Sequence, residues 1–242
     1  MEKIKKLPLW KSILFFALPS TYFFIMTRFF TPFLNQSLKL HPSLSWYVTG
    51  IFVFVPLFIM ANLLVKHENG RLDFKTLLQR LRFKKLTWED IKWTLGATLL
   101  SFIAMGIIWG ISNFLTFHFS VSALQTTPGF MSSQPLEGME RLYLLVWMLM
   151  FFFNIVGEQM LWHGYILPRQ ELTHGKWAWF VNACCWLLFH LCFGIDLIIL
   201  LLPLLFIIPF TIQRTKNTTT GLIVHAIVNG PMAVLIALGF IK

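Results

Sequence analysis

Long uninterrupted runs of apolar residues dominate the chain, with few alternations of apolar and polar positions. Crossing the ~30 Å hydrocarbon core of a bilayer takes about 20 residues of α-helix at 1.5 Å per residue. Runs that reach or approach this length cover residues 12–30, 46–65, 93–117, 142–166, 177–195, 197–212 and 220–241. Membrane β-strands would instead alternate apolar and polar residues. The pattern therefore predicts an all-α, polytopic membrane helix bundle with about seven transmembrane helices.

The composition agrees with a membrane protein and excludes several other classes. Of the 242 residues, 57% are hydrophobic and only 12% are charged, whereas soluble domains are about 45–50% apolar and about 25% charged. An ordinary soluble domain, a disordered chain and a disulfide-rich secreted module are therefore excluded. We expect a single membrane domain in which 1–141 holds three N-terminal spans and 142–242 a core of four spans.

The basic residues are distributed unevenly between the two sides that these spans would create. With the N-terminus inside, 16 of the 20 Lys and Arg residues fall on the inner side. The positive-inside rule then predicts a cytoplasmic N-terminus and an external C-terminus. We expect the protein to lie in the cell (plasma) membrane. The same distribution explains the net charge of +10 without a nucleic-acid partner.

The most charged connection, residues 66–92, has the pattern of an amphipathic helix. Phe74, Leu77, Leu78 and Leu81 are spaced i, i+3, i+4 and i+7, with basic residues between them. Such a helix packs at the membrane interface, where anionic lipid attracts its Lys and Arg side chains. We expect the loop to orient the protein and to have anionic lipid as a partner.

A few ionisable and polar residues fall inside the apolar runs, where they are costly and are candidates for function. Glu158 is the one acid well inside a run, and His190, His225 and Asn229 lie in later runs. At 1.5 Å per residue, Glu158, His225 and Asn229 lie about 12, 8 and 14 Å from the inner ends of their helices. His190 lies about 20 Å in, and a helix that starts a few residues later would bring it level. We expect the four to share a cavity.

These groups suit the hydrolysis of an amide bond. A carboxylate can accept a proton from a water, and imidazole and carboxamide donors can stabilise a developing oxyanion. Alternatively, Glu158, His190 and His225 could bind a divalent metal such as zinc, which would itself activate the water. Two further alternatives remain. The polar groups could only join helices by hydrogen bonds, or they could form the proton or ion relay of a transporter.

Three motifs in this region resemble those of the CPBP family of intramembrane endopeptidases, named for CAAX processing and bacteriocin self-immunity. The family's marks are Glu-Glu-x-x-x-Arg, then an aromatic residue followed four positions later by His, then His-x-x-x-Asn or Asp. The chain has Glu158-Gln159 with His163, Trp186 with His190, and His225 with Asn229. The family includes the Ras-converting prenyl-protein endoprotease. The resemblance covers about residues 142–229.

The resemblance implies an enzyme, a CAAX-type intramembrane endopeptidase whose active site opens toward the cytoplasmic side. Glu158 matches the family's water-activating base and His190 its catalytic histidine. His225 and Asn229 match the pair that completes the water and oxyanion site. The implied substrate is a protein or peptide in the membrane, and the resemblance leaves a glutamate-dependent and a metal-dependent mechanism open.

The first motif departs from the family at two positions, because Gln159 replaces the second glutamate and His163 replaces the arginine. The two lie at i and i+4 on one predicted helix, where side chains meet. We expect a Gln159–His163 hydrogen bond to replace the family's ion pair and to support Glu158. The alternative is a non-catalytic member, for example one that acts by binding in bacteriocin immunity.

Overall fold

The chain folds as a bundle of helices. The computed structural model describes residues 4–70, 73–131 and 134–240 and contains no β-strand within them, so the predicted fold class is confirmed. The helices, including short 3-10 and π segments, are α1 (Leu9–Ile25), η1 (Met26–Phe30), η2 (Phe33–Ser37), α2 (Pro42–Asn69), α3 (Phe74–Arg80), α4 (Trp88–Phe119), η3 (Gly138–Leu142), α5 (Tyr143–Glu158), η4 (Gln159–Ile166), α6 (Leu167–His174), η5 (Gly175–Trp177), α7 (Ala178–Phe189), η6 (Leu191–Phe193), α8 (Ile195–Thr215) and α9 (Thr218–Ala237).

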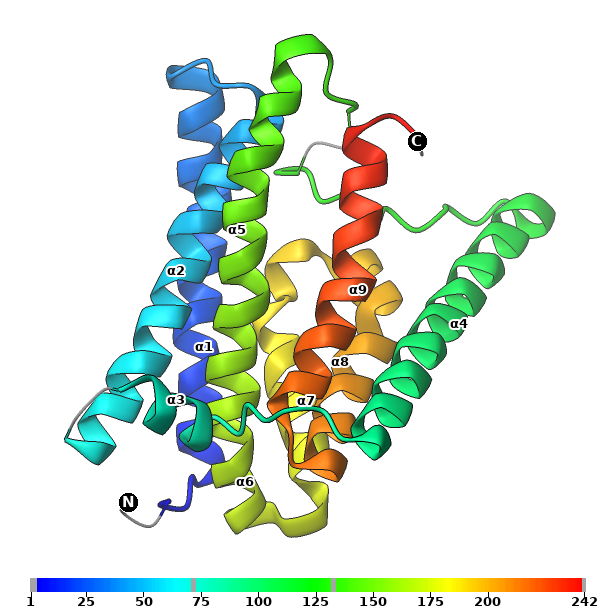
Figure 1. The fold of residues 1–242 in the computed structure, drawn as a ribbon. Helices are drawn as coiled ribbons and strands as arrows, with labels where there is room; N and C mark the ends of the chain where they lie inside the picture. Colours follow the sequence, from blue (N-terminus) through cyan, green and yellow to red (C-terminus); the bar gives the residue numbers. More distant parts are fainter. Residues whose placement is uncertain (1–3, 71–72, 132–133, 241–242) are drawn as a thin grey trace.

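The described residues contain six helices, rather than seven, that are long and apolar enough to cross a membrane. The predicted fourth and fifth runs lie together in one helical stretch, Gly138–Phe189. Within it, α7 has 12 residues and so rises only ~18 Å, less than the hydrocarbon thickness. The turn between α7 and α8 stops short of the end of the bundle that α9 reaches (Figure 1). The count of seven spans is therefore not confirmed.

The two ends of the bundle differ in charge. α1 begins at the end that also carries α3 and α6, and α9 finishes at the opposite end (Figure 1). We call the first the basic end, because Arg82, Arg169 and Lys216 lie in or beside these elements. We call the opposite end, with η2 and η3, the far end. Opposite ends for the N- and C-terminal helices agree with the predicted topology, whereas the direction across the membrane stays a prediction.

The basic connection is docked on the protein at one end of its helix. Asp73 caps α3 by accepting from the Thr76 backbone N–H at 2.9 Å. The expected apolar face divides: Phe74 is exposed, whereas Leu81 is completely buried. The Leu81 carbonyl accepts a hydrogen bond from the Thr218 hydroxyl at 2.6 Å, at the start of α9. Leu81, which the pattern placed on the membrane-facing side of the amphipathic helix, therefore belongs to the protein core.

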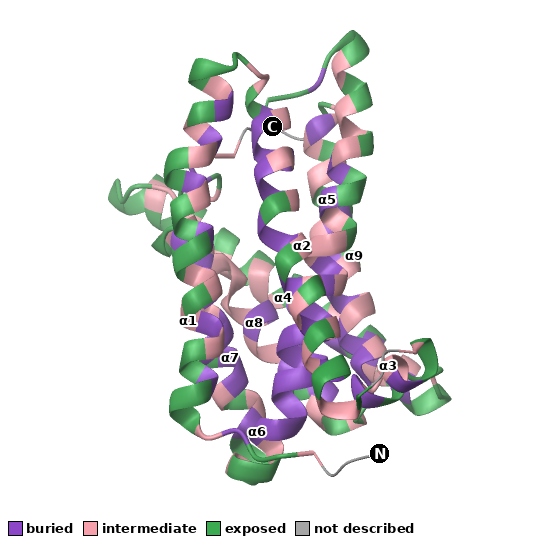
Figure 2. Cartoon of the chain, turned by 90° about the vertical axis from the view of Figure 1, so that its left-hand side faces the viewer, coloured by how far each residue is buried: buried purple, intermediate pink, exposed green. Residues whose placement is uncertain are grey.

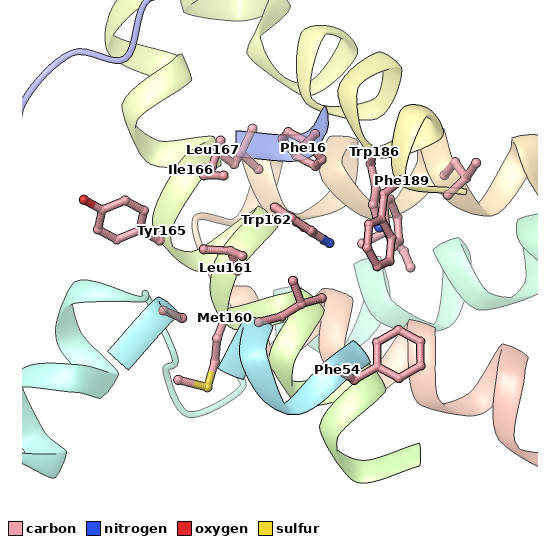
Figure 3. Close-up of a cluster of buried hydrophobic side chains, with 14 of the residues drawn as sticks. Phe16, Phe54, Met160, Leu161, Trp162, Tyr165, Ile166, Leu167, Trp186 and Phe189 are labelled. Carbon is pink, nitrogen blue, oxygen red and sulfur yellow. The ribbon is translucent and has the colours of Figure 1, made fainter. Parts of the chain in front are cut away.

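An aromatic cluster fills the interior beside α5 and α7 (Figure 3). Phe16 of α1 stacks on Trp162 with ring centroids 4.2 Å apart, and Trp162 packs against Phe189 of α7 at 5.5 Å. Such pairs add about 0.5–1.5 kcal/mol beyond the burial of their area. They fix α1 and α7 against the segment that follows Glu158.

A close approach of α2 to α5 places Glu158 inside the bundle. A Cβ atom on Gly157 would lie 3.0 Å from the carbonyl oxygen of Phe54 and 3.2 Å from the backbone nitrogen of Phe58. The two backbones can approach this closely only because residue 157 has no side chain. Glu158 follows directly and is 1% exposed.

Candidate active site

A π-helix follows the candidate base. η4 covers eight residues directly after Glu158, and π-helical turns occur frequently at functional sites. Pro168 lies in the first turn of α6 and has no N–H to donate to the carbonyl of Gly164, four residues before it. This missing donor favours a different hydrogen-bond register before α6. The consequence is that residues five apart, rather than four apart, are joined along this segment.

Both carboxylate oxygens of Glu158 accept hydrogen bonds from uncharged donors. The Trp186 indole N–H donates to Oε2 at 2.6 Å, and the Asn154 amide donates to Oε1 at 2.7 Å. Each oxygen can accept more than one hydrogen bond, so both retain capacity for a water. The two donors therefore orient the carboxylate without neutralising it.

The Trp186 ring lies at the centre of the site. The rings of His163, His190 and His225 all meet it edge-on, with centroids 4.7, 5.3 and 5.4 Å away. Trp186 comes from α7, and the groups around it come from η4, the end of α7 and α9. Glu158, His190 and His225, which the sequence predicted to share a cavity, are thus gathered around one indole.

The hydrogen bond of His190 identifies its tautomer. Its Nδ1 lies 3.0 Å from the backbone carbonyl of Trp186. A carbonyl can only accept, so Nδ1 carries the proton and Nε2 of the neutral ring has the free lone pair. His190 is therefore an acceptor at Nε2.

His225 has the opposite tautomer. The Gln159 amide nitrogen donates to His225 Nδ1 at 3.2 Å, so the proton of the neutral ring is on Nε2. Gly221, one turn earlier on α9, makes room for this contact, since a Cβ there would lie 3.1 Å from Gln159 Oε1. His190 and His225 thus offer one acceptor and one donor.

The predicted hydrogen bond between Gln159 and His163 is absent, and that expectation was wrong. In the described part of the chain, both ring nitrogens of His163 are buried without a hydrogen-bond partner. The cause is the π-helical register of η4, which does not place residues four apart as an α-helix does. Gln159 supports His225 instead.

Asn229 lies one turn beyond His225 on α9 and is half-buried. Its i, i+4 relation to His225 is the predicted one, although none of the described residues hydrogen-bonds its side chain. Sequence reasoning missed Asn154 as a site residue and took Trp186 only as the aromatic position of a motif. An amide four residues before the buried acid, inside an apolar run, was the available signal for Asn154.

The described side chains do not form a metal centre. No group of three or more His, Cys, Asp and Glu residues among them is arranged to hold a metal ion. Glu158, His190 and His225 each contact the Trp186 indole, and no hydrogen bond joins any two of these three described side chains. The three residues therefore do not fit a zinc site of the kind that the sequence left open.

Packed protein lies on the side of the site that faces the basic end. Every residue from 157 to 170 is buried, and Figure 2 shows buried segments gathered near α6 and α3. Arg169 forms an ion pair with Glu68 and lies over the Tyr165 ring at 3.4 Å, while the Tyr165 hydroxyl donates to Glu68 at 2.7 Å. This cluster ties α6 to the end of α2.

Comparison with known proteins identifies the segment that carries the site. Residues 140–230 match the family model described as "Type II CAAX prenyl endopeptidase Rce1-like". The match includes Glu158, His190, His225 and Asn229 and leaves out the first three predicted spans. No curated protein and no solved structure gives a significant match to the chain. With six apolar helices long enough to cross a bilayer among its described residues, the chain is an integral membrane protein whose residues 140–230 are similar to the Rce1-like CAAX prenyl endopeptidases.

Proposed function

We propose that the protein is an intramembrane endopeptidase that hydrolyses peptide bonds with a water activated by Glu158. The observation that carries the proposal is the Glu158 carboxylate, buried in the bundle and oriented by Trp186 and Asn154. A carboxylate buried without a cation is costly. Its retention beside two histidines of complementary tautomers supports a role in proton transfer.

The roles follow from the donors and acceptors. Glu158 takes one proton from the water while the water oxygen bonds to the carbonyl carbon of the peptide. The carbonyl oxygen becomes an oxyanion, which the His225 Nε2–H and the Asn229 amide stabilise. When the C–N bond breaks, the proton on Glu158 passes to the leaving nitrogen. His190 Nε2 accepts a hydrogen bond from the water and helps to place it.

The decisive experiment is peptide hydrolysis by the purified protein in detergent or liposomes. Glu158→Gln keeps the size of the side chain and removes its basicity, so we expect a rate loss of about 10²–10⁴-fold. Glu89→Gln is the matched control, because Glu89 is an exposed acid in the first turn of α4. Equal rates for the two variants would refute the mechanism.

A non-catalytic role in binding, for example in bacteriocin immunity, is the alternative that the altered first motif favours. Gln159 and His163, which stand where the motif has a glutamate and an arginine, are both completely buried. If the folded wild-type protein bound peptides and hydrolysed none across a broad peptide library, this alternative would replace the proposal. A transporter or proton relay would instead move ions in liposomes without cleaving peptide.

The setting proposed for the reaction is the plasma membrane, with a cytoplasmic N-terminus, a protein or peptide substrate and anionic lipid at the basic loop. The binding of anionic lipid is supported by Lys75, which is exposed beside Phe74 on α3. Cleavage near the cytoplasmic face was predicted from depths along the helices. Because residues 157–170 fill the space between Glu158 and the basic end, we place the reaction at the level of Glu158 inside the bundle.

A further inference from the structure

A pocket of about 490 Å³ lies between His190 and the far end. This volume is in the range of ~300–1,000 Å³ typical of ligand sites. Its walls come from η1 and η2, the first residue of α2, residues 128–131 and η6. In Figure 1, the continuation of α1 and the connection before α5 lie in the half of the bundle away from α3 and α6.

One wall of this pocket is the turn that directly follows His190. Cys192, Phe193 and Gly194 all line it. The Phe193 N–H donates to the His190 carbonyl at 3.0 Å, and the two rings lie 5.6 Å apart. A ligand in the pocket therefore lies one short turn from a residue of the proposed catalytic site.

Among the described residues that line the pocket, Arg28 is the one that carries a charge. It lies in the first candidate span, Leu9–Ser37, where a charged side chain is costly and marks function by default. Its guanidinium lies 5.5 Å from the Phe24 ring and forms no ion pair within the described residues. The side chain is exposed and the neighbouring lining residues Asn35 and Gln36 are polar. The pocket thus offers an uncompensated cation and amide groups.

We propose that this pocket is the substrate's binding subsite next to the catalytic groups, and that Arg28 binds a carboxylate of the peptide there. The proposal rests on the function proposed above and names the recognition that accompanies it. A guanidinium matches a carboxylate with two parallel hydrogen bonds, and the apolar walls formed by Phe130, Met131 and Phe193 suit the side chains of a membrane peptide. The carboxylate is either the C-terminus of the peptide or an acidic side chain.

The direction of approach follows from the same geometry. The buried residues 157–170 lie on the side that faces the basic end, so the peptide reaches Glu158 from the far-end side. With a cytoplasmic N-terminus, this pocket opens toward the external half of the membrane.

Binding is tested separately from catalysis in the Glu158→Gln protein, which should fold and bind without cleaving. The probe is a fluorescently labelled library of apolar peptides, prepared as free acids, as C-terminal amides and with Asp or Asn at one position. We expect Arg28→Gln to weaken binding of the carboxylate-bearing forms about tenfold or more, and Arg28→Lys to restore part of it. If Arg28→Gln no longer affects binding of the C-terminal amides, the carboxylate is the C-terminus of the peptide. If it no longer affects binding when Asn replaces Asp, the carboxylate is the acidic side chain.

Arg141→Gln is the matched control, since Arg141 is an exposed arginine at the far end that does not line the pocket. Equal binding of acid and amide peptides, or equal effects of Arg28→Gln and Arg141→Gln, would overturn the assignment of Arg28. Failure of the proposed function gives a different result, in which the wild-type protein hydrolyses no peptide while the effect of Arg28→Gln on binding persists.

Discussion

Replacing Trp186 by Phe tests whether the indole N–H orients the catalytic carboxylate. The variant keeps an aromatic ring near His190 and His225, and it removes the donor that lies 2.6 Å from Glu158 Oε2 together with part of the ring volume. Trp186 is completely buried, so water does not readily replace this donor.

The size of the effect follows from the strength of the lost interaction. A hydrogen bond to a charged group contributes about 1.5–3 kcal/mol, which at about 1.4 kcal/mol per factor of ten corresponds to a rate loss of roughly 10- to 150-fold. Asn154 still holds the other oxygen at 2.7 Å, so the loss should be smaller than that of Glu158→Gln. Peptide hydrolysis should show the loss mainly in kcat, because the indole contacts the catalytic carboxylate of Glu158. It does not line the pocket at Arg28 in which we propose that the peptide binds.

The control separates this effect from the loss of ring volume. Trp147 of α5 is also buried and stacks on Phe151 at 4.8 Å, so Trp147→Phe makes the same change in size without touching Glu158. Thermal unfolding in detergent checks that both variants fold. If Trp186→Phe and Trp147→Phe hydrolyse peptide at the same rate while Glu158→Gln is inactive, the orienting role of the indole is wrong.

Two further predictions concern packing and topology. A Cβ on Gly164 would lie 2.9 Å from both the Cβ and the carbonyl oxygen of Leu81, so Gly164→Ala should lower the free energy of unfolding by about 1–3 kcal/mol in detergent. Gly106→Ala, whose Cβ would meet nothing within 4 Å, should unfold like the wild type, and equal stability of the two variants would contradict the docking of the basic loop. Reporter fusions should find the N-terminus in the cytoplasm and the C-terminus outside. A C-terminal reporter that is active only in the cytoplasm would contradict the predicted topology.

Much of the architecture could be predicted because it depends on properties local to each segment. A run of 20 apolar residues forms a helix in lipid whatever surrounds it, since every backbone group must be hydrogen-bonded within the membrane. The one acid inside such a run was therefore recognisable as a candidate base. The spacing of His225 and Asn229 on one helix likewise needed no tertiary information.

Contacts between helices were decided by the tertiary structure. Sequence spacing predicts which side chains share a face of one regular helix, but it does not reveal which face meets a neighbour. The π-helical register of η4 turned Gln159 toward His225 and left His163 without a polar partner. A local change in backbone hydrogen bonding thus replaced a pairing that a regular α-helix would have favoured.

The sequence alone determined the membrane class of this protein, its helical fold and the polar residues that its spans retain, because these follow from hydrophobic burial and backbone hydrogen bonding along each segment. Only the tertiary structure showed that the Trp186 indole gathers Glu158, His190 and His225, and that Arg28 lines a pocket beside them. The physical reason is that these contacts join segments from the first third to the end of the chain, and close packing between helices selects them.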